Sequence, residues 1–188
     1  ISACLVGSEM CIRDSNYFVM KIAIIYGSTL GNTERVANKI AEKINLDNLD
    51  VLNVAETSAE KLNEYDKIIF GSSTWGLGDL QDDWDNFDFK NLKVENKTVA
   101  IFGMGDSEVY AFTYCDSIKK LHDILKSKKA NIVGYVSTQG YKYSKSESVE
   151  NDMFLGLALD DENYEDLTEE RIENLSLIHI SEPTRQAE

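Results

Sequence analysis

The sequence predicts an α/β protein built on a doubly wound, five-stranded parallel sheet, and three observations support this class. Short apolar segments alternate with helical segments from residue 21 to residue 136. The short apolar segments are the predicted strands, and they are apolar at consecutive positions, so both faces of each strand are expected to be covered. Gly-rich loops follow three of them, at the sheet edge where such folds bind ligands. The alternation itself implies right-handed crossovers and helices on both faces.

Each element is recognised by its own pattern. Five short, apolar, β-rich segments are the predicted strands: residues 21–26, 50–54, 67–71, 98–104 and 131–136. Three amphipathic or polar segments are the predicted helices between them: residues 34–44, 58–65 and 116–129. In the first helix Val36, Ile40 and Ile44 lie four residues apart and form one apolar stripe.

Composition excludes several classes of function. The 188 residues include 33 acids and 19 bases, a formal net charge of −14. Nucleic acids and anionic membranes are therefore unsuitable partners, whereas a basic protein fits. No apolar run reaches the roughly 18 residues of a spanning helix. The three cysteines, Cys4, Cys11 and Cys115, are too few for a disulfide framework, so we expect a reducing, cytoplasmic location.

Both ends of the chain differ from its middle. Residues 1–19 begin with Ile and lack the basic start and unbroken apolar run of a signal peptide. Residues 175–188 interrupt an acidic helical pattern, and both ends resemble translated sequencing-adapter sequence. We therefore predict a non-native or disordered extension at 1–19, one domain at 20–174 with a truncated last helix, and a non-native tail at 175–188.

The loop after the first strand, residues 27–33 (GSTLGNT), has the composition of an anion site. Hydroxyl and amide side chains combine there with free backbone N–H groups and the partial positive charge of a helix start. The loop lacks the Gly-Lys-Ser/Thr of a nucleotide-hydrolysing site and the G-x-G-x-x-G of a dinucleotide site. A phosphate monoester fits best, although an ordinary capped turn has the same composition.

Aromatic residues follow the third and fourth strands. Trp75 lies in a Gly-rich loop and can stack on a flat ligand, although a tryptophan that closes the core is the common alternative. Tyr110 follows the fourth strand, where Phe112 and Tyr114 compete for the same role. Two aromatic loops beside an anion loop predict a planar ring system that carries a phosphate.

Together these loops resemble the flavodoxin family over residues 20–174. Residues 28–33 approximate its phosphate-loop pattern S/T-x-T-G-x-T, with Thr-Leu where x-Thr is usual. Residues 74–76 and 105–110 match its two flavin loops. The polar insertion 138–152, followed by the apolar run 154–159, resembles the long-chain members, whose last strand is interrupted. The resemblance implies strand order 2-1-3-4-5.

The resemblance implies a low-potential, one-electron carrier that uses bound FMN, with no catalytic residue and no metal. Its implied partners are redox proteins, such as a basic NADP reductase or oxidoreductase that docks on an acidic surface, and we expect a monomer. The implied cofactor-binding residues are Ser28, Thr29, Leu30, Gly31, Asn32, Thr33, Ser73, Thr74, Trp75, Gly76, Met104, Gly105, Asp106, Tyr110 and Cys115.

The implied mechanism is electrostatic. Acids near the flavin, Asp79, Asp82, Asp83 and Asp106, would lower its potential, and a flipped peptide would offer the Gly76 carbonyl to N5. Three alternatives remain. An NAD(P)H-dependent quinone or flavin reductase would need a further basic patch for the nucleotide. A receiver domain would need acids where Tyr26-Gly27-Ser28 stands, and a cofactor-free interaction module would follow if the truncated helix prevented FMN binding.

Overall fold

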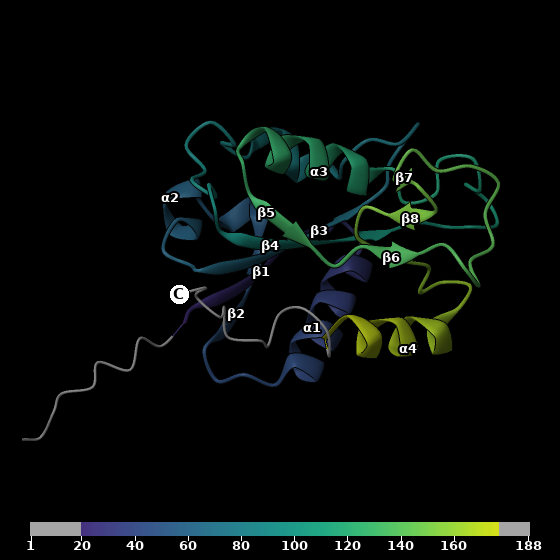
Figure 1. Ribbon diagram of the computed structural model, residues 1–188, viewed down its shortest axis with the longest axis horizontal. Helices are drawn as coiled ribbons and strands as arrows, with labels where there is room; N and C mark the ends of the chain where they lie inside the picture. Colours follow the sequence, from purple (N-terminus) through teal and green to yellow (C-terminus); the bar gives the residue numbers. More distant parts are fainter. Residues whose placement is uncertain (1–19, 177–188) are drawn as a thin grey trace, which may run out of the picture.

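The computed structural model describes residues 20–176, and in these residues helices cover both faces of a parallel sheet (Figure 1). The strands of that sheet are β1 (Ile22–Gly27), β2 (Leu49–Asn53), β3 (Lys67–Ser73), β4 (Thr98–Met104), β5 (Asn131–Val133) and β9 (Leu157–Leu159). The helices are α1 (Asn32–Ile44), α2 (Ala59–Leu62), α3 (Ser117–Ser127) and α4 (Glu165–Ser176), with short 3₁₀ turns η1 (Val54–Glu56) and η2 (Asp82–Asn86).

The strand order is β2-β1-β3-β4-β5, as predicted, and every pair in this sheet is parallel. The fifth position is divided between two strands. β5 pairs with the first part of β4, from Thr98↔Asn131, and β9 pairs with its last part, from Phe102↔Leu157. The carboxyl ends of β1, β3, β4 and β9 therefore meet at one edge of the sheet.

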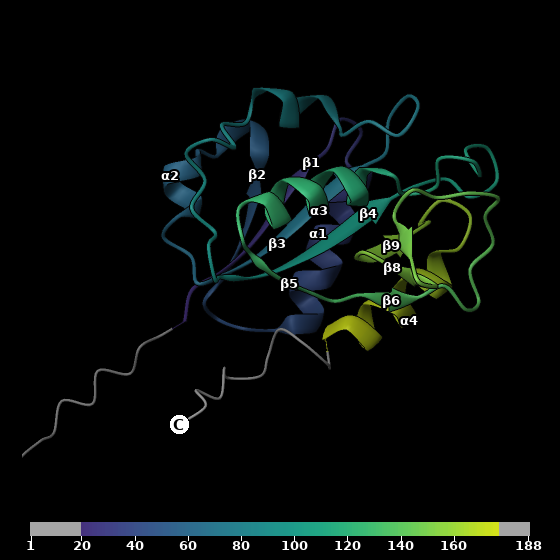
Figure 2. The ribbon, with the colours of Figure 1, turned by 45° about the horizontal axis from the view of Figure 1, so that its top comes forward.

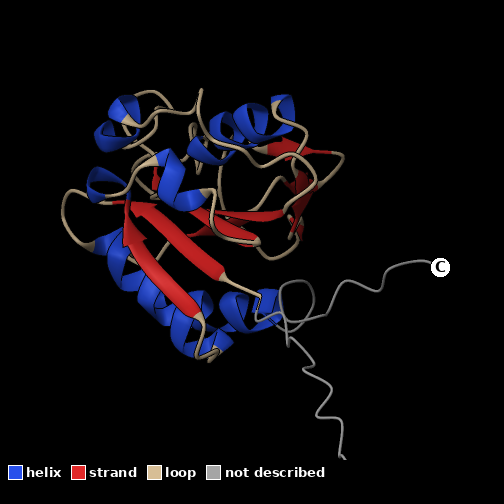
Figure 3. Ribbon diagram, turned by 90° about the vertical axis from the view of Figure 1, so that its left-hand side faces the viewer, coloured by secondary structure: helices blue, strands red, loops and turns tan. Residues whose placement is uncertain are grey.

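Two apolar cores explain why both faces of the strands had to be apolar. On one face, α1 packs against the sheet through Val36 and Ile40, beside Ile172 of α4. On the other face, α3 packs through Ile118, Leu121 and Leu125 together with α2 and η2. Figure 3 shows the helices on the two sides of the strands. The expected amphipathic stripes are thus the packing surfaces.

The predicted fifth strand, residues 131–136, is shorter than its apolar pattern suggested. The chain leaves the main sheet after Val133, and Gly134 has a φ of 86°. Val136 begins a separate antiparallel sheet of order β6-β8-β7, formed by β6 (Val136–Ser137), β7 (Val149–Glu150) and β8 (Met153–Phe154). Figure 2 shows this small sheet beside the end of the main one. The insertion is therefore a folded unit.

Other boundaries differ modestly from the predictions. The helix expected at 58–65 is the single turn of α2, and α4 begins at Glu165 and extends two residues beyond the predicted domain end. The predicted extensions, 1–19 and the remainder of 175–188, lie outside the described residues.

Candidate functional site

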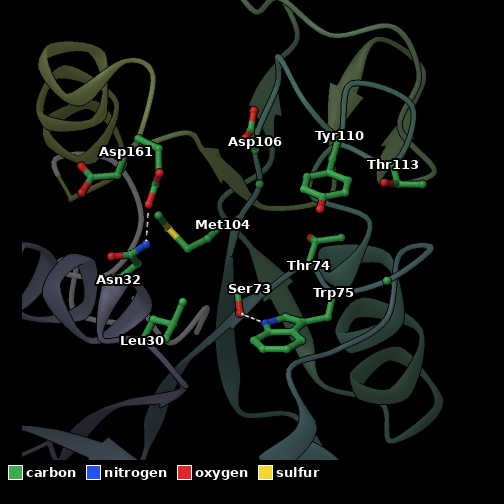
Figure 4. A pocket seen from close by; sticks show the side chains of 13 residues that line it. Leu30, Asn32, Ser73, Thr74, Trp75, Met104, Asp106, Tyr110, Thr113 and Asp161 are labelled. Carbon is green, nitrogen blue, oxygen red and sulfur yellow. Dashed lines mark hydrogen bonds between the residues drawn. The ribbon is translucent and has the colours of Figure 1, made fainter.

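A cavity of about 370 Å³ lies at the carboxyl edge of the sheet, where the loops after β1, β3, β4 and β9 converge. Figure 4 shows Trp75 and Tyr110 on one side of it and Asn32 and Asp161 on the other, with Met104 between them. Its lining residues are Leu30, Asn32, Ser73, Thr74, Trp75, Gly76, Met104, Gly105, Asp106, Tyr110, Thr113, Asp161 and Glu162.

The loop after β1 turns directly into α1. Gly31 is the N-cap residue, with a φ of 85°, and its backbone N–H donates to Ser28 Oγ at 3.1 Å. The Thr29 hydroxyl accepts from the buried Gln81 amide at 3.1 Å, which ties this loop to the loop after β3. No side chain caps the first turn of α1, so its backbone N–H groups are available to an anionic ligand.

The loop after β3 presents Trp75 at the cavity with a defined orientation. Its indole Nε1 donates to Ser73 Oγ at 2.8 Å, and its backbone pairs with Asp79 in a tight turn that contains Gly76 at a φ of 53°. Thr74 Oγ1 donates to Ser117 Oγ of α3 at 3.0 Å. Trp75 is 36% exposed, so one part of the ring faces a ligand or solvent.

The loop after β4 is shaped by the Asp106 carboxylate. This group accepts from the backbone N–H groups of Glu108 and Val109 at 2.9 and 2.8 Å, and from the Asn163 amide at 3.0 Å. Burial raises the pKa of Asp106, but these hydrogen bonds outweigh it and hold the pKa below its ordinary value. The carboxylate is thus ionised and committed to shaping the loop.

The structure distinguishes the three aromatic residues that competed in this loop. Tyr110 lines the cavity, whereas Phe112 is 72% exposed and does not. Tyr114 is buried and stacks on Tyr143 of the insertion, with ring centroids 5.6 Å apart. Trp84, the other tryptophan of the chain, is buried in the core.

The polar end of the cavity is formed by α1 and the loop after β9. Asn32 Nδ2 donates to Glu162 Oε1 at 2.8 Å. The Asp161 side chain has no exposed surface and binds Arg35 of α1 through two hydrogen bonds of 3.0 and 2.7 Å. Hydrogen bonding to Asp161 raises the pKa of the Arg35 guanidinium.

Ten of the fifteen predicted cofactor-binding residues line the cavity: Leu30, Asn32, Ser73, Thr74, Trp75, Gly76, Met104, Gly105, Asp106 and Tyr110. Four more lie in the loop after β1 and the first turn of α1 but do not line the cavity: Ser28, Thr29, Gly31 and Thr33. The cavity is also lined by Thr113, Asp161 and Glu162, which were not predicted, although the last two follow a strand that ends at the same edge.

Cys115 is placed differently from the other candidates. It is fully buried, and its Sγ lies 3.5 Å from the Gly103 carbonyl oxygen and 3.7 Å from that of Leu159. Burial raises the pKa of the thiol above its ordinary value. Its side chain therefore belongs to the core and not to the cavity lining.

The charge of the cavity is unusual for an anion site. The residues that line it include three acids and, within the described part of the chain, neither Lys nor Arg. No group of His, Cys, Asp and Glu within residues 20–176 is arranged to hold a metal ion. Between the same limits, no helix has the length and apolar character that crossing a bilayer requires.

Comparisons with known proteins agree with this geometry. The flavodoxin family model matches residues 24–174. Flavodoxin 1 of Escherichia coli K12 is 39% identical over 153 residues, which are 80% of this chain and 87% of the relative. The flavodoxin of Buchnera aphidicola is 42% identical over 156 residues, 81% and 91% of the two chains.

A solved structure is similar over the same region. Fusobacterium nucleatum flavodoxin, whose structure was determined with bound flavin mononucleotide, superposes with a TM-score of 0.78 at 28% identity, over 84% of this chain and 95% of that one. The resemblance inferred from the three loops is confirmed, and the chain belongs to the flavodoxin family.

Proposed function

We propose that this protein is a one-electron carrier whose FMN binds in the cavity between Trp75, Tyr110 and the start of α1. Family membership makes it an electron-transfer flavoprotein and not an enzyme. The bound FMN supplies the redox chemistry, and the chain supplies binding, orientation and electrostatics.

The observation that carries the proposal is the two-part character of the cavity. At one end, Trp75 and Tyr110 offer aromatic surfaces to an isoalloxazine ring. At the other, the uncapped first turn of α1 offers N–H groups to a phosphate. A flat ring system joined by a short polar chain to a phosphate fits both ends at once.

The acids that are predicted to lie near the flavin ring differ in how strongly they can lower its redox potential. Asp79 forms an ion pair with Lys120 of α3, and Asp106 is hydrogen-bonded to its own loop. Their effect on a reduced flavin is therefore smaller than the sequence alone suggested. Asp82 of η2, which is also predicted to lie near the flavin, is exposed and has no such contact among the described residues, so it is the better candidate for lowering the redox potential of the flavin.

The surface around the cavity suits docking to a redox partner. The loops that form the cavity carry four apolar side chains that are more than half exposed: Leu30, Leu77, Val109 and Phe112. Five acids within residues 79–88 follow Leu77 along the chain. A basic reductase or oxidoreductase could pack against the apolar side chains while its positive charge complements these acids. The electrostatic attraction that guides the two proteins together would weaken as the salt concentration rises. We infer a cytoplasmic monomer that meets its partners transiently.

A reductase that uses NAD(P)H directly is the less suitable function. Such an enzyme needs cations for the nucleotide phosphates, and the described residues that line the cavity provide none.

The test uses the purified full-length chain. We expect a yellow protein that releases FMN on denaturation and, in an anaerobic reductive titration, takes up electrons in two separated one-electron steps. Electron transfer from a basic reductase should slow as salt rises. A folded chain that neither retains nor rebinds FMN contradicts the proposal, and rapid NADPH oxidation without a partner would favour the reductase.

A further inference from the structure

The loop after β9 is rigidly anchored on both sides of the cavity. The buried Asp160 carboxylate accepts hydrogen bonds from the backbone N–H and the hydroxyl of Ser107, at 2.9 and 2.6 Å. The neighbouring Asp161 is bound by Arg35 of α1, as described above. Because two consecutive residues are held by two different elements, the backbone that carries Glu162 has little freedom to move away.

This anchoring places the Glu162 carboxylate over the start of α1. Its Oε1 is 2.8 Å from Nδ2 of Asn32, the first residue of that helix, and both side chains line the cavity. Figure 4 shows this hydrogen bond as the dashed line that leaves Asn32. The carboxylate therefore lies where the helix would bind a phosphate.

Glu162 differs from the other two acids of the cavity. Asp161 is neutralised by Arg35 and Lys39, and Asp106 is surrounded by backbone N–H groups. Glu162 is exposed, and it forms no ion pair with any described residue; the hydrogen bond found for its carboxylate comes from the neutral Asn32 amide. Its negative charge is thus not balanced by a cation in contact.

We propose that Glu162 is a specificity-determining residue that limits the affinity of the cavity for phosphorylated flavins. The inference rests on the proposed function, because it assumes that the flavin phosphate binds at the start of α1. A phosphate monoester carries a charge of about −1.5 to −2 at pH 7, so a carboxylate nearby repels it. Riboflavin has the same ring and ribityl chain without the phosphate and escapes this repulsion.

The test compares two ligands on the full-length chain after removal of its flavin. Glu162→Gln keeps the side-chain shape and an acceptor for Asn32 while it removes the charge. We expect the Kd for FMN to fall by about three- to tenfold and the Kd for riboflavin to change by less than about twofold. The gain in FMN affinity should shrink at high salt.

Glu165→Gln is the matched control. It removes the same charge from the same segment, but Glu165 pairs with Lys39 and does not line the cavity, so the ratio of the two Kd values should stay unchanged. An unchanged ratio in Glu162→Gln, or an equal shift in the control, overturns the proposal. If Glu162→Gln weakens the binding of FMN and of riboflavin equally, the proposal is also overturned, because Glu162 would then act on the ribityl chain that both ligands share. A wild-type chain that binds neither flavin contradicts the proposed function itself.

Discussion

The buried carboxylate of Asp116 accepts a hydrogen bond of 2.7 Å from the backbone N–H of Glu147. Asp116 immediately precedes α3, and Glu147 belongs to the insertion between β6 and β7. Ser146 Oγ donates to the same oxygen at 3.2 Å. One carboxylate thus joins the insertion to the end of the loop that carries Tyr110.

Replacing Asp116 by Ala should lower the free energy of unfolding by about 1–3 kcal/mol, because the Glu147 N–H loses its partner in a partly buried site. Asp116→Asn keeps an acceptor oxygen and should lose less. Urea denaturation of the flavin-free variants measures both changes. Equal losses in the two variants would show that this hydrogen bond is not their source.

The same residue should give the stability a specific pH dependence. Burial raises the pKa of Asp116 above its ordinary value of 3.8, against the opposing hydrogen bonds from Glu147 and Ser146. The folded carboxyl then holds its proton more tightly than the unfolded chain does, so its contribution to stability falls as pH rises from about 4 through the raised pKa. Over that range Asp116→Asn should gain stability relative to the wild type. A stability difference that is constant with pH would contradict this.

Two ion pairs of α1 should differ in their effect on stability. Arg35 binds Asp161, whose side chain is fully buried, whereas Lys43 and Glu173 are both largely exposed. Arg35→Gln should cost about 1–2 kcal/mol, because Asp161 keeps only part of its compensation, from Lys39. Lys43→Gln should leave stability almost unchanged. Thermal unfolding of both variants checks the contrast, and equal effects would count against the role of burial.

The strand order and the three ligand loops could be predicted because local patterns encode them. Continuous apolar segments identify the strands, and a parallel sheet brings their carboxyl ends together. The division of the fifth position could not be predicted. Residues 131–136 have the pattern of one strand, yet only the register with β4 decides that β5 stops at Val133 and that β9 completes the edge. Such long-range pairing leaves no local signal.

The polar end of the cavity was missed for a related reason. Residues 160–173 include eight acids, and such a run of acids indicates the solvated face of a helix. Asp161 departs from this pattern because Arg35, 126 positions earlier in the sequence, lies where it can compensate the burial of the carboxylate. The position of Asp161 and Glu162 directly after β9 is the available signal, since the loops that follow β1, β3 and β4 are predicted to bind the ligand.

Tyr110 and Phe112 provide a direct test of which aromatic residue contacts the ring system. Tyr110→Ala should raise the Kd for FMN by roughly three- to tenfold, the effect of losing one stacking contact of about 0.5–1.5 kcal/mol. Phe112→Ala is the matched control, because this exposed side chain does not line the cavity, and it should change the Kd little. Fluorescence titration of the flavin-free proteins measures both. The reverse order would assign the stacking role to Phe112.

Gly76 should affect the redox properties of the protein separately from its stability. Its φ of 53° lies in the left-handed region, where Ala costs roughly 1–2 kcal/mol, although an added Cβ would meet only Asp79 Oδ2 at an ordinary 3.4 Å. Gly140 of the insertion, with a φ of 81° and open space around it, should lose comparable stability as Gly140→Ala. The two variants differ in position, because of these two glycines only Gly76 lines the cavity.

In Gly76→Ala the peptide next to the ring site is less free to turn its carbonyl toward the flavin, so the two one-electron midpoint potentials should move closer together. In Gly140→Ala their separation should equal that of the wild type. Anaerobic spectroelectrochemistry measures the separation, and a similar change in both variants would mean that loss of stability, and not the Gly76 peptide, is the cause.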